Sequence, residues 1–576
     1  MPVFYLFELE SFNSYPVRFL QDFLPKHIPI IIFDLILLYI LFAVVFFLVK
    51  KAWINVFFFS ILMSAASLTN YIKYALTGEN FLPHDIIMAG NMNEIVNFIS
   101  IDLPWWAWVL IAIALFAAII PGVFAKDAPF KFYIRIPVAV ILSTVIVIFF
   151  GNSNIASKVF YKIGLTYEAT DNQDTHYRAR GFVGAFSVNI SSFAIQKPEG
   201  YSNAKLETEL NKYLEVPPSD DFANPDIIVV LSESFWDPRL LPGSEITPNP
   251  FENFDELSSR ENSYSGGLIV PAFGGGTIRT EFEILTGFSV DALPKGVVPY
   301  NVIKKNIPSY VSYYKDLGYD AIAIHPYLER FYNREKCFPR LGFDEYYAES
   351  LSDIKEVTPY ERGYYVSDDS FVDYLEYFLN NADKPMFLFG ITMENHQGYR
   401  FKFDYNKFTV RAVNPNLNEE DDHKYKHYVQ GVQDADASLG KLCEFIDNRE
   451  RPTVVVFFGD HLPSICSNNT AYLDTGFISD TQSSESKIKL YTTPFIVYSN
   501  FKLNKNAANH DFVASYDLLN LLASLIGSGK TRYMGYLDAL REVVPYYNVR
   551  LNIKLTTEQK EFLRVQYYAT YNAVTK

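Results

Sequence analysis

The sequence predicts an α/β protein in two parts, a helical transmembrane bundle followed by a layered α/β domain. Apolar residues are concentrated between Ile28 and Phe150, and the sequence that follows is globular in composition. Farther along the chain, short apolar segments alternate with stretches of helical length, which is the pattern of a layered sheet. We therefore expect a transmembrane domain at residues 1–151, an extracellular linker at 152–223 and an α/β domain at 224–576.

Four apolar segments are long enough to cross a bilayer, which takes about 20 residues of helix. Each is bounded by polar or aromatic residues, as the ends of membrane spans are. The predicted spans are Ile28–Val49, Trp53–Tyr71, Trp105–Phe124 and Phe132–Phe150.

Basic residues set the expected orientation of these spans. Lys50 and Lys51 follow the first span, Lys126 and Lys131 follow the third, and residues 76–104 contain no lysine or arginine. Loops rich in lysine and arginine stay in the cytoplasm. The sequence thus predicts a multi-pass protein of the cell membrane whose α/β domain is extracellular.

Composition excludes two classes of protein. The formal net charge is -15, and so acidic a chain is poorly suited to nucleic acid. The three cysteines, Cys337, Cys443 and Cys466, are too few and too scattered for a disulfide framework. We expect the lipid bilayer, and no nucleic acid, as a partner.

Five short segments of the second part are predicted strands, because they are apolar on both faces as buried parallel strands are. Helices are expected between them, and ligands are expected beyond the carboxyl ends of the strands. The predicted strands are Asp226–Leu231, Ala321–His325, Met386–Ile391, Thr453–Gly459 and Pro494–Ser499. The predicted helices are Asn301–Leu317, Ser367–Asn380 and Tyr425–Asp447.

Acids and an imidazole follow two of these strands. Glu233 comes directly after the first, and Asp460 and His461 come directly after the fourth. Carboxylate and imidazole donors suit Mn²⁺ or Mg²⁺, with Zn²⁺ also allowed by the set. The alternative is structural: Glu233 as an acid at a helix N-terminus, facing the helix dipole, and a polar strand end with a surface histidine.

Thr277 is the candidate nucleophile. The three glycines Gly274 to Gly276 precede it and permit a tight turn. A hydroxyl beside a divalent cation becomes a competent nucleophile because the cation lowers its pKa, and a helix N-terminus stabilises a phosphate. Thr277 also fits as a helix cap, which is compatible with catalysis. Thr280, one turn later, is the competing candidate.

Three further residues are candidates for substrate binding. His325 ends a predicted strand, and His396 lies five residues beyond another. They are expected as phosphate donors or acid–base groups, although a buried histidine with satisfied nitrogens is the usual alternative. Arg334 is expected to hold a phosphate through two hydrogen bonds, with a surface ion pair as its alternative.

Read in order, these motifs resemble a known family. They are Ser-Glu-Ser-Phe from 232, Gly-Gly-Gly-Thr-x-x-Thr-Glu-Phe-Glu-x-Leu-Thr-Gly from 274, His-Pro-Tyr from 325, Asn-Arg from 333, Glu-Asn-His from 394 and Phe-Gly-Asp-His-Leu-Pro from 458. The set is similar to that of the lipoteichoic acid synthase family. Those proteins are membrane-anchored phosphoglycerol transferases whose outer domain is an α/β sandwich of the alkaline phosphatase/sulfatase type.

The resemblance implies a Mn²⁺ site formed by Glu233, Thr277, Asp460 and His461, with Thr277 as nucleophile. It implies a substrate pocket lined by His325, Arg334 and His396. The implied reaction moves glycerol phosphate from phosphatidylglycerol, through a phosphothreonine intermediate, to a glycolipid or a growing polyglycerolphosphate chain. Such a reaction builds lipoteichoic acid in Gram-positive cell walls.

Two departures leave the substrate open. The family often has five spans where four are counted here, and residues 395–399 differ from the commoner His-Gly-Pro-Tyr and His-Phe-Pro-Tyr forms. The alternatives are a transferase of phosphoethanolamine or another headgroup, a phosphodiesterase, and a non-catalytic membrane scaffold. Scattered cysteines argue against the disulfide-rich phosphoethanolamine branch, and the intact metal-site motif argues against the scaffold.

Overall fold

The chain folds as two compact units. The computed structural model describes residues 2–14, 16–49, 51–77, 80–83, 85–86, 105–124, 130–165, 173–191, 195, 197–294, 297–465, 470–505 and 510–576. Unit 1 comprises Met1–Ala194 and Pro294–Gly296, and unit 2 comprises Ile195–Leu293 and Val297–Lys576. The predicted boundaries 1–151, 152–223 and 224–576 remain predictions. Lys50, Lys126, Cys466 and most of the loop 76–104 lie outside the described residues.

Unit 1 carries the membrane anchor. Among the described residues, three helices are long and apolar enough to cross a membrane by length and composition: Ile28–Leu48 (α3), Trp53–Tyr74 within α4 (Ala52–Thr77), and Phe132–Gly151 (α7). The third predicted span forms the 20-residue helix α6 (Trp105–Phe124). Most side chains of α3 and α7 lie on the surface of the unit, where apolar residues are stable in contact with lipid.

The segment predicted as a linker is largely helical. It contains α8 (Ser153–Ile163), α9 (Gln173–Arg180), α10 (Phe182–Ser191) and α11 (Asn203–Leu210). Phe182 of α10 packs in one apolar cluster with Tyr5 of α1 (Pro2–Ser14). Residues up to 194 are therefore part of unit 1, and α11 belongs to unit 2.

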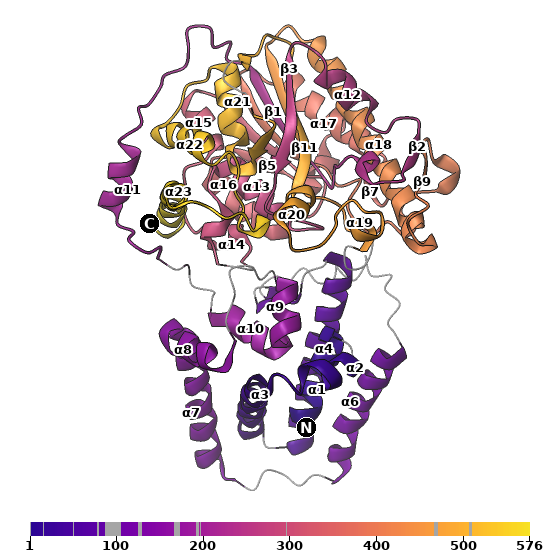
Figure 1. Cartoon of the computed structure of the whole chain (residues 1–576), viewed down its shortest axis with the longest axis vertical. Helices are drawn as coiled ribbons and strands as arrows, with labels where there is room; N and C mark the ends of the chain where they lie inside the picture. The colour runs from indigo at the N-terminus through magenta and orange to yellow at the C-terminus, as the bar shows by residue number, and fades with distance from the viewer. Residues whose placement is uncertain are drawn as a thin grey trace. The chain divides into compact units, whose positions relative to one another are not determined.

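Unit 2 is built on one eight-stranded sheet with the strand order β12-β3-β11-β10-β1-β8-β4-β5, seen near the centre of this unit in Figure 1. All five predicted strands are present: β1 (Asp226–Ser232), β4 (Asp320–Ile324), β8 (Met386–Ile391), β10 (Thr453–Gly459) and β11 (Thr492–Ser499). The other three are β3 (Ser263–Ile269), β5 (Glu345–Tyr347) and β12 (Phe512–Ala514). Two small ribbons pair β2 (Glu245–Thr247) with β9 (Arg411–Val413) and β6 (Glu361–Arg362) with β7 (Tyr365–Val366).

The sheet is mixed, so one prediction about it is wrong. Strands β4, β8, β1 and β10 are mutually parallel, as expected. Strand β11, predicted to be parallel, runs antiparallel to β10, with Phe458 opposite Phe495. Its apolar pattern reflects burial on both faces, and such burial is independent of strand direction. The α/β fold class itself is confirmed.

Helices cover both faces of this sheet (Figure 1). One face carries α17 (Asp368–Asn380) and α18 (Glu419–Asp447), which pack on Ile228 and Val455. The opposite face carries α13 (Thr277–Thr286), α15 (Tyr310–Asp316), α21 (Leu518–Ile526) and α22 (Arg532–Val543). The remaining α-helices of unit 2 are α12 (Glu252–Ser258), α14 (Pro299–Val302), α16 (Arg334–Leu341), α19 (Thr470–Asp474), α20 (Ser484–Leu490) and α23 (Thr557–Thr575).

The predicted helices agree with the structure except at one place. Helix α17 begins after its cap Ser367, as predicted, and α18 extends the predicted helix toward its N-terminus. The predicted helix Asn301–Leu317 is divided into α14 and α15. Pro308 lies between them and disfavours helical geometry in the residue before it, while Ser309 forms a capping box that starts α15.

Gly459, the last residue of β10, gives a test of the packing beside the sheet edge. A Cβ at this position would lie 1.9 Å from the Phe235 carbonyl oxygen. Overpacking costs about 1–3 kcal/mol, and a backbone carbonyl cannot rotate away, so we expect Gly459→Ala to cost at least the upper value. Thermal unfolding of the full chain in detergent measures it. Gly535→Ala in α22 meets no atom closer than 3.3 Å and should change the melting temperature little; equal shifts in both variants would contradict the prediction.

Candidate active site

The functional candidates lie at one edge of the sheet. Strand β1 pairs with β10 so that Ser232 is opposite Gly459. Glu233 comes directly after β1, and Asp460 comes directly after β10. His325 follows β4, and β4 and β8 are parallel to β1. The carboxyl ends of parallel strands meet at one rim, which is where ligands bind in such sheets.

Glu233, Asp460 and His461 form a compact cluster that can hold a metal ion. One ligand atom from each lies within 4.8 Å of the others, and all three residues are buried. The Nε2 atom of His461 is 3.2 Å from Oδ2 of Asp460 and 3.7 Å from Oε1 of Glu233. Two carboxylates and one imidazole are suitable ligands for a divalent cation.

The polar atoms of this cluster fit a bound cation. The Nδ1 atom of His461 is 3.0 Å from the Leu462 carbonyl oxygen, and a proton donated there leaves Nε2 as the ligating nitrogen. Oδ2 of Asp460 is buried and accepts no hydrogen bond among the described residues. Burial and the charge of Glu233 raise the pKa of Asp460 to about 6, as expected for two acids held close together.

Ser234 orients the carboxylates and was not recognised from the sequence. Its amide donates to Oδ1 of Asp460 at 2.8 Å, and its hydroxyl donates to Oε1 of Glu233 at 2.9 Å. Its backbone is left-handed, with φ 54°, and such strain in a residue other than glycine persists only where surrounding contacts enforce it. Tyr428 supplies one such contact, since its hydroxyl donates to the Ser234 carbonyl at 3.0 Å. The Ser-Glu-Ser motif was the available signal.

Thr277 stands at the first turn of α13, directed at this cluster. Gly274, Gly275 and Gly276 all have positive φ, at 65°, 141° and 89°, so the turn before the helix requires residues without a side chain. The Thr277 hydroxyl donates to Oε2 of Glu233 at 3.4 Å. The competing candidate, Thr280, donates its hydroxyl to the Asp460 carbonyl at 2.8 Å. Its role in this structure is to support the strand end.

Arg334 is not a surface residue. It is 1% exposed and forms a buried ion pair with Glu281, whose Oε2 is 2.8 Å from Nη2. The Nη1 atom is buried and has no hydrogen-bond partner among the described residues. The surface-pair alternative is therefore wrong, and one donor of the guanidinium remains for a ligand.

His325 lies near this guanidinium. Burial, and then the charge of Arg334, lower the pKa of His325 well below its usual value, so its ring is neutral. Nδ1 is 3.1 Å from the Ile391 carbonyl oxygen. A proton donated to that oxygen makes Nε2 an acceptor, and Nε2 is buried without a partner among the described residues. His325 therefore suits a ligand hydroxyl, which can donate a hydrogen bond to Nε2, better than a phosphate oxygen, which can only accept one.

His396 borders the metal-ligand cluster. Burial lowers its pKa, and the charges of Lys402 and His461 lower it further. Its Nδ1 is 3.3 Å from the Tyr365 hydroxyl. Lys402 and Tyr365 were missed in the sequence because no strand end or motif marks them. The predicted residues Glu233, Thr277, Asp460 and His461 therefore lie together, with His396 beside them.

Divalent cations provide a test of the candidate metal site. A ligand present at 100 times its Kd stabilises a protein by about 2.7 kcal/mol, so Mn²⁺ added to the metal-free full chain should raise its melting temperature. Asp460→Asn should abolish that rise, because it removes a ligand charge from the cluster. Asp316→Asn, which changes an exposed acid in α15, should retain it. A rise that persists in Asp460→Asn would place the ion elsewhere.

We expect the buried Glu281–Arg334 pair to contribute strongly to the free energy of unfolding. Removing one member of a buried pair leaves an uncompensated charge and costs about 3–5 kcal/mol, so Glu281→Gln should lower the free energy of unfolding by that amount. The exposed pair Lys384–Asp320, 3.1 Å apart, serves as control, because Asp320→Asn should cost at most about 1 kcal/mol. Denaturant unfolding followed by fluorescence compares the two. Similar losses of unfolding free energy in Glu281→Gln and Asp320→Asn would contradict the prediction, because the buried pair would then contribute no more than the exposed one.

Several known proteins are similar to this chain in sequence. Residues 225–528 match the sulfatase family. A putative cyclic beta-1,2-glucan modification protein of Rhizobium meliloti (strain 1021) is 31% identical over 445 residues, 74% of this chain and 66% of that protein. Lipoteichoic acid synthase 1 of Bacillus subtilis (strain 168) is 21% identical over 384 residues, 65% of this chain and 54% of that protein. The chain thus spans two thirds or less of the length of these relatives.

One solved structure supports the same fold. Streptococcus pyogenes phosphoglycerol transferase GacH, in complex with sn-glycerol-1-phosphate, matches with a TM-score of 0.53 and 23% identity, over 66% of this chain and 95% of that one. The family match covers more than half of the chain and includes every candidate site residue. The chain therefore belongs to the sulfatase family of enzymes.

Proposed function

We propose that this protein transfers glycerol phosphate from phosphatidylglycerol to a hydroxyl acceptor, through a covalent intermediate on Thr277. The observation that carries this proposal is the placement of the Thr277 hydroxyl, at the N-terminus of α13 and 3.4 Å from Oε2 of Glu233. A nucleophile, a carboxylate and a helix N-terminus meet there, which are the requirements for attack on a phosphodiester.

Glu233, Asp460 and His461 would hold the cation, with Thr277 as the fourth ligand. Mn²⁺ is the proposed ion, and Mg²⁺ is the alternative that the same donors accept. When bound there, a divalent cation lowers the pKa of the Thr277 hydroxyl and neutralises charge on the phosphate.

In the first step, Oγ1 of Thr277 forms a bond to phosphorus and the bond to diacylglycerol breaks. Oε2 of Glu233, to which the Thr277 hydroxyl donates at 3.4 Å, is a carboxylate acceptor for the hydroxyl proton. Diacylglycerol leaves as an alcohol after taking up a proton. The amides of the first turn of α13 stabilise the negative charge that develops on the phosphate.

In the second step, an acceptor hydroxyl attacks the glycerophosphothreonine and restores Thr277. Nη1 of Arg334 is the buried donor available to a phosphate oxygen, and Nε2 of His325 is the buried acceptor available to a hydroxyl. The headgroup of phosphatidylglycerol offers such hydroxyls. An ethanolamine headgroup offers an ammonium instead, which the neighbouring Arg334 charge disfavours. Water in place of the acceptor gives phosphodiesterase activity as a side reaction.

Two classes of acceptor fit this chemistry. The motif resemblance favours a glycolipid or a growing polyglycerolphosphate chain, as in lipoteichoic acid synthesis. The relative whose name refers to glucan modification, 31% identical over 74% of this chain, favours a sugar hydroxyl of a glucan as the second candidate. Both use the same Thr277 intermediate and differ only in the attacking hydroxyl.

The membrane anchor suits a lipid donor. Tethering an enzyme to the bilayer raises the effective concentration of lipid headgroups around it. With Lys51 and Lys131 in cytoplasmic loops, as expected from the positive-inside rule, the catalytic unit lies outside the cell. An extracellular transferase that takes its phosphate from a lipid needs no nucleotide.

The covalent intermediate gives the direct test. The full chain in detergent is incubated with Mn²⁺ and phosphatidylglycerol and analysed by intact and peptide mass spectrometry. We expect a glycerophosphate adduct on the Thr277 peptide and release of diacylglycerol. Thr277→Ala should lose both, because the attacking oxygen is gone. Thr286→Ala, at the other end of α13 where the hydroxyl bonds within the helix, should keep both.

Donor exchange separates the alternatives. Phosphatidylethanolamine in place of phosphatidylglycerol should give less than about a tenth of the adduct, which corresponds to about 1.4 kcal/mol of discrimination. A phosphoethanolamine adduct of equal yield would overturn the glycerol assignment and leave Thr277 as nucleophile. Absence of every adduct in protein shown to bind Mn²⁺ would overturn the mechanism.

A further inference from the structure

Lys402 is a buried lysine that neither the sequence motifs nor the proposed mechanism explains. Only 5% of its surface is exposed, and lysine is almost never so buried unless it is paired. It lies six residues after His396, in a segment that follows β8 and precedes α18. Its ammonium must therefore have structural or functional partners within unit 2.

The ammonium contacts two groups that fix His396. Nζ of Lys402 donates to the His396 carbonyl oxygen at 2.6 Å. The same atom lies 4.7 Å from the centroid of the Tyr365 ring, and the Tyr365 hydroxyl is 3.3 Å from Nδ1 of His396. One side chain thus holds the main chain of His396 directly and its imidazole through Tyr365.

A group of buried acids offsets the charge of Lys402. Burial lowers the pKa of Lys402 to about 7, and the charges of Glu394, Glu233 and Asp368 act in the opposite direction. An amine donates to a carbonyl oxygen in both protonation states, so the contact with His396 does not depend on this titration.

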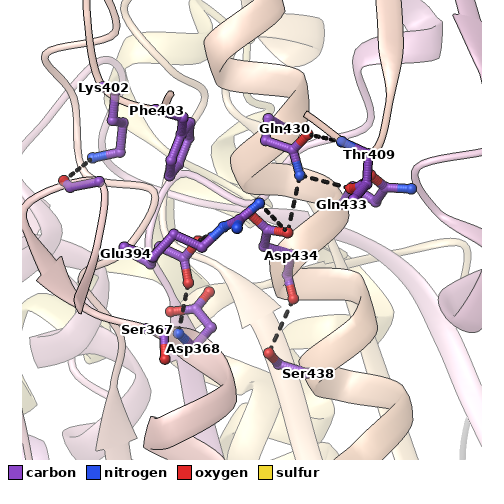
Figure 2. A network of polar contacts seen from close by, with 12 residues as sticks. Ser367, Asp368, Glu394, Lys402, Phe403, Thr409, Gln430, Gln433, Asp434 and Ser438 are labelled. Carbon is purple, nitrogen blue, oxygen red and sulfur yellow. Dashed lines mark hydrogen bonds and ion pairs between the residues drawn. The ribbon is translucent and has the colours of Figure 1, made fainter. Parts of the chain in front are cut away.

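Arg362 and the Asp368 amide keep Glu394, one of these acids, in place. Oε1 of Glu394 is 3.3 Å from Nε of Arg362, which also lies 2.6 Å from Oδ2 of Asp434 on α18. The amide of Asp368 donates to Oε2 of Glu394 at 2.7 Å. Figure 2 shows these acids side by side between α17 and α18, with Lys402 on the other side of Glu394. The charge of Glu394, held in place by these contacts, acts on Lys402 and favours its ammonium form.

We propose that Lys402 is a positioning residue for His396, acting through the His396 carbonyl and the Tyr365 ring. The inference builds on the proposed transferase function, since it assigns His396 to the same reaction. His396 borders the cluster of Asp460 and His461, which both influence its pKa. An imidazole beside these residues can exchange a proton with an incoming or leaving hydroxyl, and general acid–base groups contribute about 10²–10⁴-fold in rate.

A double-mutant cycle tests this role. Lys402→Met, His396→Gln and the double variant are prepared as full chains in detergent with Mn²⁺, and kcat and KM are measured for bis(p-nitrophenyl) phosphate and for diacylglycerol release. Each single substitution should lower kcat about 100-fold with KM changed less than twofold. The double variant should lie within about twofold of His396→Gln, because residues that act through one another are not additive.

Two variants separate positioning from general stability. Tyr365→Phe keeps the ring and loses the hydroxyl contact with His396, so kcat should fall about tenfold, roughly the effect of one lost hydrogen bond. Lys487→Met removes another buried lysine, 8% exposed on α20, and should leave kcat unchanged. If Lys402→Met fails to fold, the cycle between Tyr365→Phe and His396→Gln decides. Additive losses in either cycle, or a loss of equal size in Lys487→Met, would overturn the proposal.

The reactivity of His396 gives a readout that does not require turnover. Diethyl pyrocarbonate modifies accessible imidazoles, and peptide mass spectrometry follows His396 against His510 as internal reference. Lys402→Met and Tyr365→Phe should release the His396 ring from its contacts and raise the rate of its modification about tenfold. Unchanged modification rates would overturn the proposal. If the wild type hydrolyses the aryl diester but releases no diacylglycerol, the transferase proposal fails, and the cycle on the aryl diester still decides the role of Lys402.

Discussion

The parallel pairing of β1 with β10 is the constraint on which the rest of the site depends. Because Ser232 lies opposite Gly459, the two chains leave the sheet side by side, and Glu233 and Asp460 emerge as neighbours. The Ser234 amide then bonds Oδ1 of Asp460, which joins the two strand ends. Gly459 makes the arrangement feasible, since the Phe235 carbonyl occupies the space that a Cβ would need.

Around this edge, buried charges are balanced in pairs. Glu281 on α13 neutralises Arg334 on α16, so the helix that carries Thr277 is tied to the helix that carries the proposed phosphate-binding arginine. At the opposite end of β1, Asp226 is paired with Arg449, which holds the start of the strand. A charge buried without a partner costs several kcal/mol, and these pairs explain how an acidic chain packs so many ionisable groups beside one sheet.

Different elements of unit 2 contribute different groups to the site. The strand ends carry residues that can hold a cation, and α13, with its glycine turn, carries the proposed nucleophile Thr277 at the positive end of a helix. Behind the site, Arg362 joins Glu394, which follows β8, to Asp434 on α18. Lys402 contacts the His396 carbonyl oxygen from the segment between β8 and α18.

The sequence by itself determined the α/β class, the five apolar strands and the residues that follow them, because burial on both faces and an abrupt polar ending are local features of the chain. It also predicted Glu233, Asp460 and His461 at those endings and Thr277 after the glycine run, and the structure brings these residues together. It did not reveal β3, whose segment Ser-Tyr-Ser-Gly-Gly-Leu-Ile has little apolar character. Only the tertiary structure decided the direction of β11, the burial of Arg334 against Glu281, and the contact of Lys402 with His396. Each of these depends on which distant segments pack together, and the spacing of residues along the chain does not determine that.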